Sequence, residues 1–172
     1  SATAKGKGYG GAIFLDNGTT DAPGKVTLTN VNIQNNVSYR AGGAIYVAKN
    51  RQLEINGSNT VINGNITSDS GGAIGTNTGA TVTLNAGTIR GNETKNAKDG
   101  GAIYLWQASF IMNGGSIKEN KAGVTAATNK AGRGGAIFVS TGSSINLSNG
   151  EISGNKAYYR AGAIYIDGES SL

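Results

Sequence analysis

The residues that support catalysis in most enzymes are few in this chain, and two kinds are missing. The sequence has no Cys and no His, which removes thiol nucleophiles, imidazole bases and Cys/His metal sites. A polysaccharide lyase or glycoside hydrolase would instead need clustered carboxylates with a basic residue beside them. The 10 acidic residues do not recur, because no position of the repeat described below carries an acid in two successive copies. We therefore expect no catalytic residues, no cofactor and no enzymatic activity.

One loop contains the oxygen-bearing side chains that Ca²⁺ prefers. Asp16-Asn17-Gly18 is followed by Asp21, and carboxylate and carbonyl oxygens are the usual calcium ligands. A lone loop of this composition is more often a turn, and the Gly-Gly-x-Gly-x-Asp calcium repeat is absent from the sequence. We predict that the chain has no metal site.

Basic residues recur just before a glycine-rich motif. The candidate basic edge consists of Arg40, Arg133 and Arg160, with aromatic residues at Tyr39 and Tyr159 beside it. Two interpretations remain open: a solvated corner that keeps the molecule soluble, or an edge that captures sulfated, sialylated or other anionic glycans. The formal net charge is +5, but the basic residues are scattered, so we expect no nucleic-acid partner.

The element that must position any site is a glycine-rich strand that recurs along the whole chain. Copies of Gly-Gly-Ala-Ile begin at Gly10, Gly42, Gly71, Gly100 and Gly134, and a sixth copy begins with Ala161. The start-to-start spacings are 32 (10 to 42), 29 (42 to 71), 29 (71 to 100), 34 (100 to 134) and 27 (134 to 161) residues. A period in this range indicates a solenoid, a propeller or an array.

Two further periodic elements follow each of the first five copies. The first is a short segment that alternates apolar and polar residues, such as Val82-Thr83-Leu84, and the second is an Ile-x-x-Asn motif. Three short strands per repeat, separated by turn residues, predict one coil of a parallel β-helix. The predicted fold is all-β: a right-handed, single-stranded parallel β-helix, or solenoid, with about five complete coils of three short strands and a partial sixth.

The asparagines of the Ile-x-x-Asn motif form a column at one corner of the predicted coil. We expect them to lie inward as a structural ladder that satisfies backbone groups of the bend and of the next coil. Three of them match the glycosylation sequon, which an inward position would make accidental. The column is Asn36, Asn65, Asn92, Asn120 and Asn155.

The glycine-rich strand predicts a second column, because alternate residues of a strand share a face. Its isoleucine recurs in all six copies and is the better candidate for the interior, so the aromatic position next to it should point outward. This candidate ligand-binding column is Phe14, Tyr46, Tyr104, Phe138 and Tyr165, with Trp106 beside it and Gly75 as a gap. We expect the alanines of the motif to form a flat outward strip next to it (Ala12, Ala44, Ala73, Ala102, Ala136 and Ala163). Two roles are open for the aromatic column: a ladder that stabilises the stack, or a strip that docks sugar rings, a host protein or a neighbouring domain.

Two longer loops interrupt the repeat. Asp16 to Lys25 and Lys121 to Arg133 should project from the shaft, where variable function usually lies. Ser1 to Tyr9 resembles the tail of a preceding coil, and Asp167 to Leu172 follows the sixth glycine-rich strand. We expect residues 1–172 to form a single β-helix segment, a fragment of a longer repeat array in which neighbouring coils of the parent protein are partners.

The amino-acid composition indicates in which cellular compartment the chain is expected. The chain has 29 Gly and 1 Pro, which is too much glycine for helices and too little proline for a linker or collagen. No apolar run reaches the length of a membrane helix, and no signal-peptide pattern is present. We expect no membrane insertion by this segment. A Cys-free chain held together by backbone ladders is compatible with a bacterial surface.

These motifs resemble a known group of proteins. Tandem Gly-Gly-Ala-Ile and Phe-x-x-Asn repeats are typical of chlamydial polymorphic outer-membrane proteins and of related bacterial surface β-helix repeat proteins. The resemblance extends from Gly10 to Ile166, with Ile33, Ile62, Ile89, Ile117 and Ile152 in place of the Phe. It implies an extracellular location, at a bacterial cell surface or secreted, and adhesion or host-factor binding.

The expected function is that of a non-catalytic cell-surface adhesin segment that binds a host or surface ligand, a glycan or glycoprotein. One alternative is a passive structural stalk that displays another domain. A second alternative is a polysaccharide lyase-like enzyme, because such enzymes also use parallel β-helices.

Overall fold

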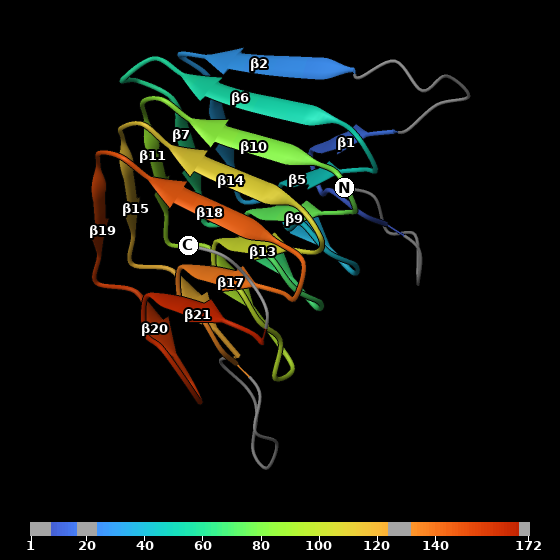
Figure 1. The fold of residues 1–172 in the computed structure, drawn as a ribbon, viewed down its shortest axis with the longest axis vertical. Coiled ribbons are helices and arrows are strands. Elements are labelled where there is room, and N and C mark those ends of the chain that lie inside the picture. Colours follow the sequence, from blue (N-terminus) through green and yellow to red (C-terminus); the bar gives the residue numbers. More distant parts are fainter. Residues whose placement is uncertain (1–7, 17–23, 124–131, 169–172) are drawn as a thin grey trace.

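The computed structural model describes residues 8–16, 24–123 and 132–168 of the chain. The chain winds into a shaft, and each coil contributes one strand to each of several parallel sheets (Figure 1). The described part contains strands and no helix. The parallel β-solenoid of about five turns predicted from the repeat is confirmed.

Sheet A holds the glycine-rich strands in the order β1 (Ile13–Leu15), β5 (Ile45–Val47), β9 (Ile74–Thr76), β13 (Ile103–Leu105), β17 (Ile137–Val139) and β21 (Ile164–Ile166). Sheet B contains β2 (Lys25–Thr29), β6 (Gln52–Asn56), β10 (Thr81–Leu84), β14 (Ser109–Met112) and β18 (Ser144–Leu147). Sheet C contains β3 (Asn32–Gln34), β7 (Val61–Asn63), β11 (Thr88–Arg90), β15 (Ser116–Lys118) and β19 (Glu151–Ser153).

A fourth sheet was not predicted from the sequence. Sheet D contains β4 (Val37–Ser38), β8 (Ile66–Thr67), β12 (Glu93–Thr94), β16 (Lys121–Ala122) and β20 (Lys156–Ala157). Each of its strands has two residues, which is too short to produce a visible alternation. Each coil therefore has four strands rather than three.

The interior is a set of in-register columns. Ile45 pairs with Ile74 and Ile103 pairs with both Ile74 and Ile137, and all four side chains are fully buried. Fully burying one isoleucine contributes about 1.5–3 kcal/mol. The predicted inward isoleucine is confirmed by this packing.

The expectation of an outward alanine strip was wrong. Ala44, Ala73, Ala102 and Ala136 are fully buried in the same core cluster as the isoleucines. The carbonyl of Ala73 accepts hydrogen bonds from two successive amides, those of Ala44 and Ile45. The chain therefore bends at the alanine, and the strand begins only at the isoleucine, so strict alternation does not extend back to the alanine.

The two glycines of each pair are required for different physical reasons. Gly71 has a φ of 75°, a left-handed conformation that glycine adopts without penalty. At Gly72 a Cβ would lie 2.0 Å from the carbonyl oxygen of Gly101 in the next coil. The first glycine therefore allows the turn, and the second allows two coils to approach closely at the corner.

Candidate ligand-binding site

The asparagine column lies inside the corner between sheets C and D. The side-chain oxygen of Asn92 accepts from both the backbone N–H and the side-chain amide of Asn65, each at 2.9 Å. Its own amide donates to the carbonyl of Ile62 at 3.0 Å and to the side-chain oxygen of Asn120 at 2.9 Å. The same pattern links Asn36 to Asn65 and Asn120 to Asn155. Every member of this asparagine ladder makes a similar set of bonds, which is what a structural element requires.

The three matches to the glycosylation sequon arise because a buried Ser or Thr of sheet D stands two residues after a ladder asparagine. Ser38, Thr67 and Thr94 lie two residues after an asparagine and are themselves buried in sheet D. Their hydroxyls donate to carbonyls of the adjoining corner, as Ser38 and Thr67 do to Arg40. Asn65 and Asn92 are fully buried, so these two sequons offer no accessible amide in the folded chain.

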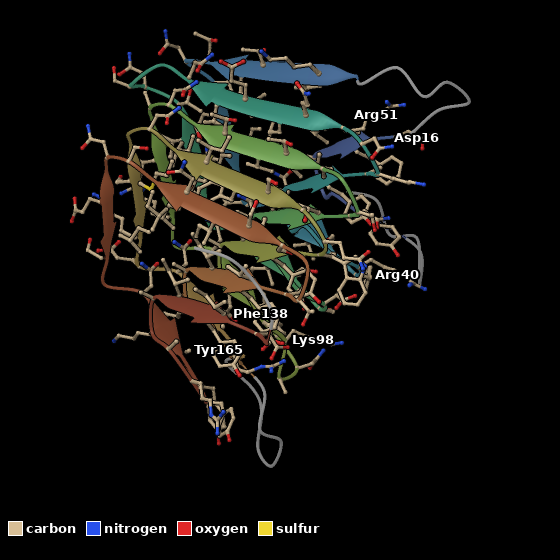
Figure 2. The ribbon with its side chains drawn as sticks, in the orientation of Figure 1. Asp16, Arg40, Arg51, Lys98, Phe138 and Tyr165 are labelled. Carbon is tan, nitrogen blue, oxygen red and sulfur yellow. The ribbon has the colours of Figure 1, made fainter. Side chains whose placement is uncertain are left out.

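The aromatic column lies on the outer face of sheet A. Phe14 stacks on Tyr46 with ring centroids 5.6 Å apart, Tyr104 on Phe138 at 5.2 Å, and Phe138 on Tyr165 at 5.5 Å. Phe138 and Tyr165 lie together beside β17 and β21 (Figure 2). The column is broken into two stacks, because Gly75 is the register partner of both Tyr46 and Tyr104.

The aromatic residues differ in how much of each ring is accessible. Phe14 at one end is 48% exposed, whereas Tyr46 is 8% and Phe138 2% exposed. Tyr46 is covered by Tyr9, whose ring centroid lies 4.3 Å away. Trp106, two residues beyond Tyr104, is 48% exposed. Tyr46 and Phe138 of the expected outward column are therefore covered, and its accessible aromatic surface lies at Phe14 and Trp106 and in part at Tyr104 and Tyr165.

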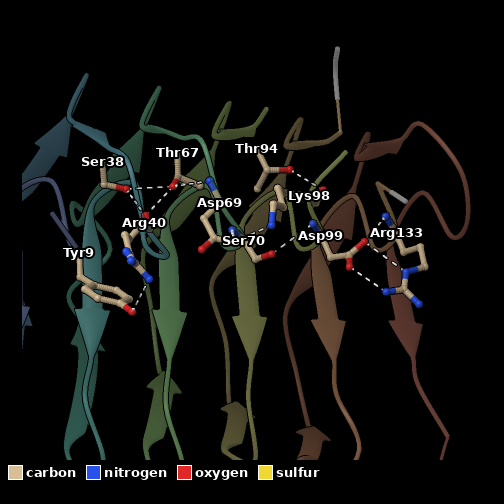
Figure 3. A network of polar contacts seen from close by, with 10 residues as sticks. All are labelled: Tyr9, Ser38, Arg40, Thr67, Asp69, Ser70, Thr94, Lys98, Asp99 and Arg133. Atoms are coloured by element: carbon tan, nitrogen blue, oxygen red, sulfur yellow. Dashed lines mark hydrogen bonds and ion pairs between the residues drawn. The ribbon is translucent and has the colours of Figure 1, made fainter. Parts of the chain in front are cut away.

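A polar network borders this column at the corner where each glycine pair begins (Figure 3). The side chains of Asp69 and Lys98 pair at 3.4 Å, and those of Asp99 and Arg133 pair at 2.9 Å. Arg133 also donates through Nε to Asp99 at 3.2 Å, so the pair is bidentate. Acidic and basic residues of successive coils neutralise one another along this edge.

Of the three arginines of the candidate basic edge, Arg133 and Arg160 are parallel β-bridge partners in adjacent coils, whereas Arg40 lies in an earlier coil. Arg133 is held by Asp99 and lies over the rings of Phe138 and Tyr165, at 4.7 and 5.0 Å from their centroids. The hydrogen bond with Asp99 is the main cause that raises the pKa of Arg133 above its ordinary value. Arg40 lies over Tyr9, and Arg160 over Tyr159.

Two hollows adjoin the accessible aromatic surface. One, of about 300 Å³, is lined by Tyr46, Asp69, Asn77, Tyr104 and Trp106 among others. The second, of about 400 Å³, also touches Tyr104 and Trp106 and continues over residues that include Arg133, Phe138 and Thr141. Trp106 and Tyr104 thus stand between two adjacent concave surfaces.

Tyr104 is partly buried at this position, and its surroundings are acidic. Burial is the largest cause that raises its pKa to about 12, and the nearby carboxylates of Asp99 and Asp69 raise it further. The phenol is neutral at physiological pH and both donates and accepts hydrogen bonds.

The polar part of this site was missed by sequence reasoning. The sequence predicts no role for Asp69, Asn77 or Asp99, although the structure brings them beside Tyr104. The available signal lies two residues before the glycine pairs that begin at Gly42, Gly71 and Gly100, where Arg40, Asp69 and Lys98 alternate in charge from coil to coil. Aligning the coils at that position places opposite charges next to each other.

The described residues contain neither a cluster of metal ligands nor a membrane-spanning helix. No group of three or more acidic side chains that would hold a metal ion is found in residues 8–16, 24–123 and 132–168. Asn17, Gly18 and Asp21 of the calcium candidate lie outside the described residues, as do 124–131 of the second long loop. Within the part of the chain that the structure covers, there is no helix both long and apolar enough to cross a membrane.

The fold and its recurring glycine-rich strand define the class as β-helix repeat proteins. Residues 30–48, which include β3, Asn36 and the Gly-Gly-Ala-Ile strand β5, match the model of the Chlamydia polymorphic membrane protein repeat. This segment of the chain is therefore similar to the repeat of that family, as its motifs indicated. No curated protein and no solved structure matches it.

Proposed function

We propose that this chain is a non-catalytic segment of a bacterial cell-surface adhesin that binds a host or surface ligand, a glycan or a glycoprotein. The repeat family supports the surface location, because its proteins are membrane proteins of the surface-exposed, adhesin-like kind. The sequence has no Cys and no His, and its 10 acidic residues do not recur at one position of the repeat, which supports a non-catalytic role.

The observation that carries this proposal is the difference between the outer faces of the sheets. The outward positions of sheet B are mostly polar, for example Thr83 and Asn146, and those of sheet C include Arg90 and Lys118. Sheet A instead carries aromatic rings at five of six equivalent outward positions, with two hollows beside them. Sheet B also has a hollow, of about 650 Å³, but among the described residues the one aromatic that lines it, Phe110, is fully buried. Concave surfaces lined by aromatic and a few polar side chains are typical of ligand sites.

A passive stalk is the alternative that another observation favours. The asparagine ladder and the isoleucine columns continue in register through all five coils, as a rigid spacer requires. The two hypotheses differ in whether sheet A has a partner outside the chain.

A binding experiment separates the two functions. The chain is applied to an array of glycans and to immobilised mucus glycoproteins at low salt, and saturable binding is expected. The variant Trp106→Ser changes the accessible aromatic surface, and Tyr158→Ser, which removes an exposed aromatic ring outside both hollows, is the matched control. Weaker binding by the first variant alone supports the adhesin, whereas no binding by the unaltered chain supports the stalk.

A further inference from the structure

The break in the aromatic column is built into the stack. A Cβ at Gly75 would lie 2.7 Å from the amide nitrogen of Gly42 and 2.8 Å from the Cβ of Ala41. No side chain fits there without moving the neighbouring coil. The ring is therefore permanently missing at this level. This gap adjoins the hollow of about 300 Å³, the recess at Gly75, whose lining includes Ala41 and the two register partners of Gly75, Tyr46 and Tyr104.

The wall of this recess offers both apolar and polar groups. Tyr104 and Trp106 provide aromatic surface on one side, and the hollow of about 300 Å³ is also lined by Asp69, Ser70 and Asn77. Aromatic faces pack against the C–H faces of a ring, while carboxylate, hydroxyl and amide groups bond to hydroxyls around its edge. This combination suits a sugar ring better than a wholly apolar ligand.

The charges of the recess argue against an anionic ligand. Among the described residues that line it, Asp69 is the charged one, and it pairs with Lys98. Arg133, which borders the second hollow, is held in a bidentate pair by Asp99. A sulfate or carboxylate placed here would face acidic groups and cations that are already paired.

A cationic ligand is also disfavoured, although aromatic residues beside an acid often bind one. Lys98 already compensates the carboxylate of Asp69, and that carboxylate also accepts the backbone N–H of Ser70 at 2.9 Å. The remaining polar groups are hydroxyls and an amide. The ligand that meets all these conditions is uncharged and rich in hydroxyl groups.

We infer that the recess at Gly75, together with the hollow on the other side of Trp106, is a binding site for a neutral oligosaccharide, with one pyranose ring on each side of the indole. Tyr104 and Trp106 supply the stacking surface, and Asp69 and Asn77 bind ring hydroxyls. This inference rests on the proposed adhesin function and identifies the site and the ligand class.

The single tryptophan of the chain makes the site directly observable. Because the sequence has 1 Trp, its fluorescence reports on Trp106 alone. The unaltered chain is titrated with lactose, cellotriose, maltotriose and chitotriose. A saturable change of emission is expected with at least one of them. Sialyllactose and a heparin-derived tetrasaccharide serve as anionic probes and choline as a cationic probe, and these should be weaker.

Variants test which residues bind. Asn77→Ala should weaken binding by a factor of about ten, because a buried polar contact with the ligand is lost. Trp106→Ser, followed by calorimetry instead of fluorescence, should weaken binding at least as much. Tyr158→Ser is the matched control, because Tyr158 is an aromatic residue that is 58% exposed and lines neither hollow. Thermal melting of each variant verifies that it is folded.

The possible results distinguish failure of the proposed sugar site from failure of the proposed adhesin function. Tighter binding of an anionic probe or of choline overturns the neutral-sugar assignment, and equal losses in Tyr158→Ser and Trp106→Ser overturn the location. Binding to an array glycan with unchanged tryptophan emission leaves the adhesin intact but places its site elsewhere. An unaltered chain that binds nothing on the array refutes both proposals.

Discussion

The asparagine ladder and the aromatic column both repeat once per coil, yet they are built differently. Asn65, Asn92 and Asn120 are all fully buried and make nearly identical hydrogen bonds. In the same central coils the aromatic column has no ring at Gly75, and Tyr104 is partly exposed whereas Tyr46 and Phe138 are buried.

This difference helps to distinguish a column that only stabilises the stack from a candidate ligand-binding site. A column that only stabilises the stack is expected to be uniform, because every coil presents it with the same backbone groups. Unequal exposure, a gap and neighbouring charges indicate that the coils have different surroundings on that face. The predictions below test whether uniformity corresponds to stability and irregularity to binding.

The largest effect is expected from breaking the ladder at its centre. Asn92→Ala removes the acceptor of the Asn65 N–H and the donor to the Ile62 carbonyl. Leaving these buried groups unsatisfied should lower the free energy of unfolding by about 4 kcal/mol. Urea denaturation measures this loss. The control is Asn113→Ala, an exposed residue whose amide bonds only to Asn85, where a loss above about 0.5 kcal/mol is not expected.

A slightly smaller loss should follow from closing the space between two glycines. In Gly72→Ala the new Cβ meets the Gly101 oxygen at 2.0 Å and the Glu93 amide nitrogen at 2.6 Å, so the two coils must separate. We expect a loss of about 2–3 kcal/mol in the same denaturation experiment. Gly8→Ala places its Cβ where no atom lies within 4 Å and should be nearly neutral. If both variants were equally stable, the close approach of coils at this corner would not require glycine.

Most of the fold was predictable, and the failures have identifiable causes. The recurring Gly-Gly-Ala-Ile and Ile-x-x-Asn motifs predicted the parallel solenoid, because each apolar position stacks on its equivalent in the next coil. Sheet D was missed because two residues carry no periodicity. The alanines were assigned outward because the bend at Ala73, where one carbonyl accepts two amides, is invisible in an alternating pattern.

The candidate site was predictable only in part. The aromatic column and its gap follow from the register, so Tyr46, Tyr104 and Gly75 could be placed from the sequence. That Tyr9 covers Tyr46 depends on where the preceding corner folds. Asp99 and Arg133 each directly precede a glycine pair, so the repeat alignment places them in adjacent coils, but the bidentate geometry of their contact depends on how the side chains fold at the corner.

The ion pairs beside the aromatic column should contribute moderately to stability and unequally. Asp99→Asn disrupts the bidentate, partly buried bond to Arg133 and should cost about 1 kcal/mol after allowance for solvent screening. Asp69→Asn affects a single, more exposed contact with Lys98 at 3.4 Å and should cost at most about 0.5 kcal/mol. Denaturation at low and high salt measures both. Equal effects would mean that this edge is as uniform as the asparagine ladder.

The smallest effect at neutral pH, and the one most specific to the site, concerns the ionisation of Tyr104. Its pKa is raised from the ordinary value of 10.0 to about 12, first by burial and then by Asp99 and Asp69. A raised pKa means that folding favours the neutral phenol. This contribution to stability is complete below pH 10, the unfolded value, and is lost as the pH rises through about 12.

Ultraviolet titration of the phenolate isolates this group as the difference between the unaltered chain and Tyr104→Phe. That difference should have its midpoint near pH 12, and in an Asp99→Asn background the midpoint should fall, because one of the nearby negative charges has been removed. A midpoint near 10 in the unaltered chain would mean that Tyr104 is as well solvated as a free tyrosine. The carboxylates of Asp99 and Asp69 would then not act on Tyr104. The contrast between a uniform asparagine ladder and an aromatic column with distinct local surroundings would then not hold at Tyr104.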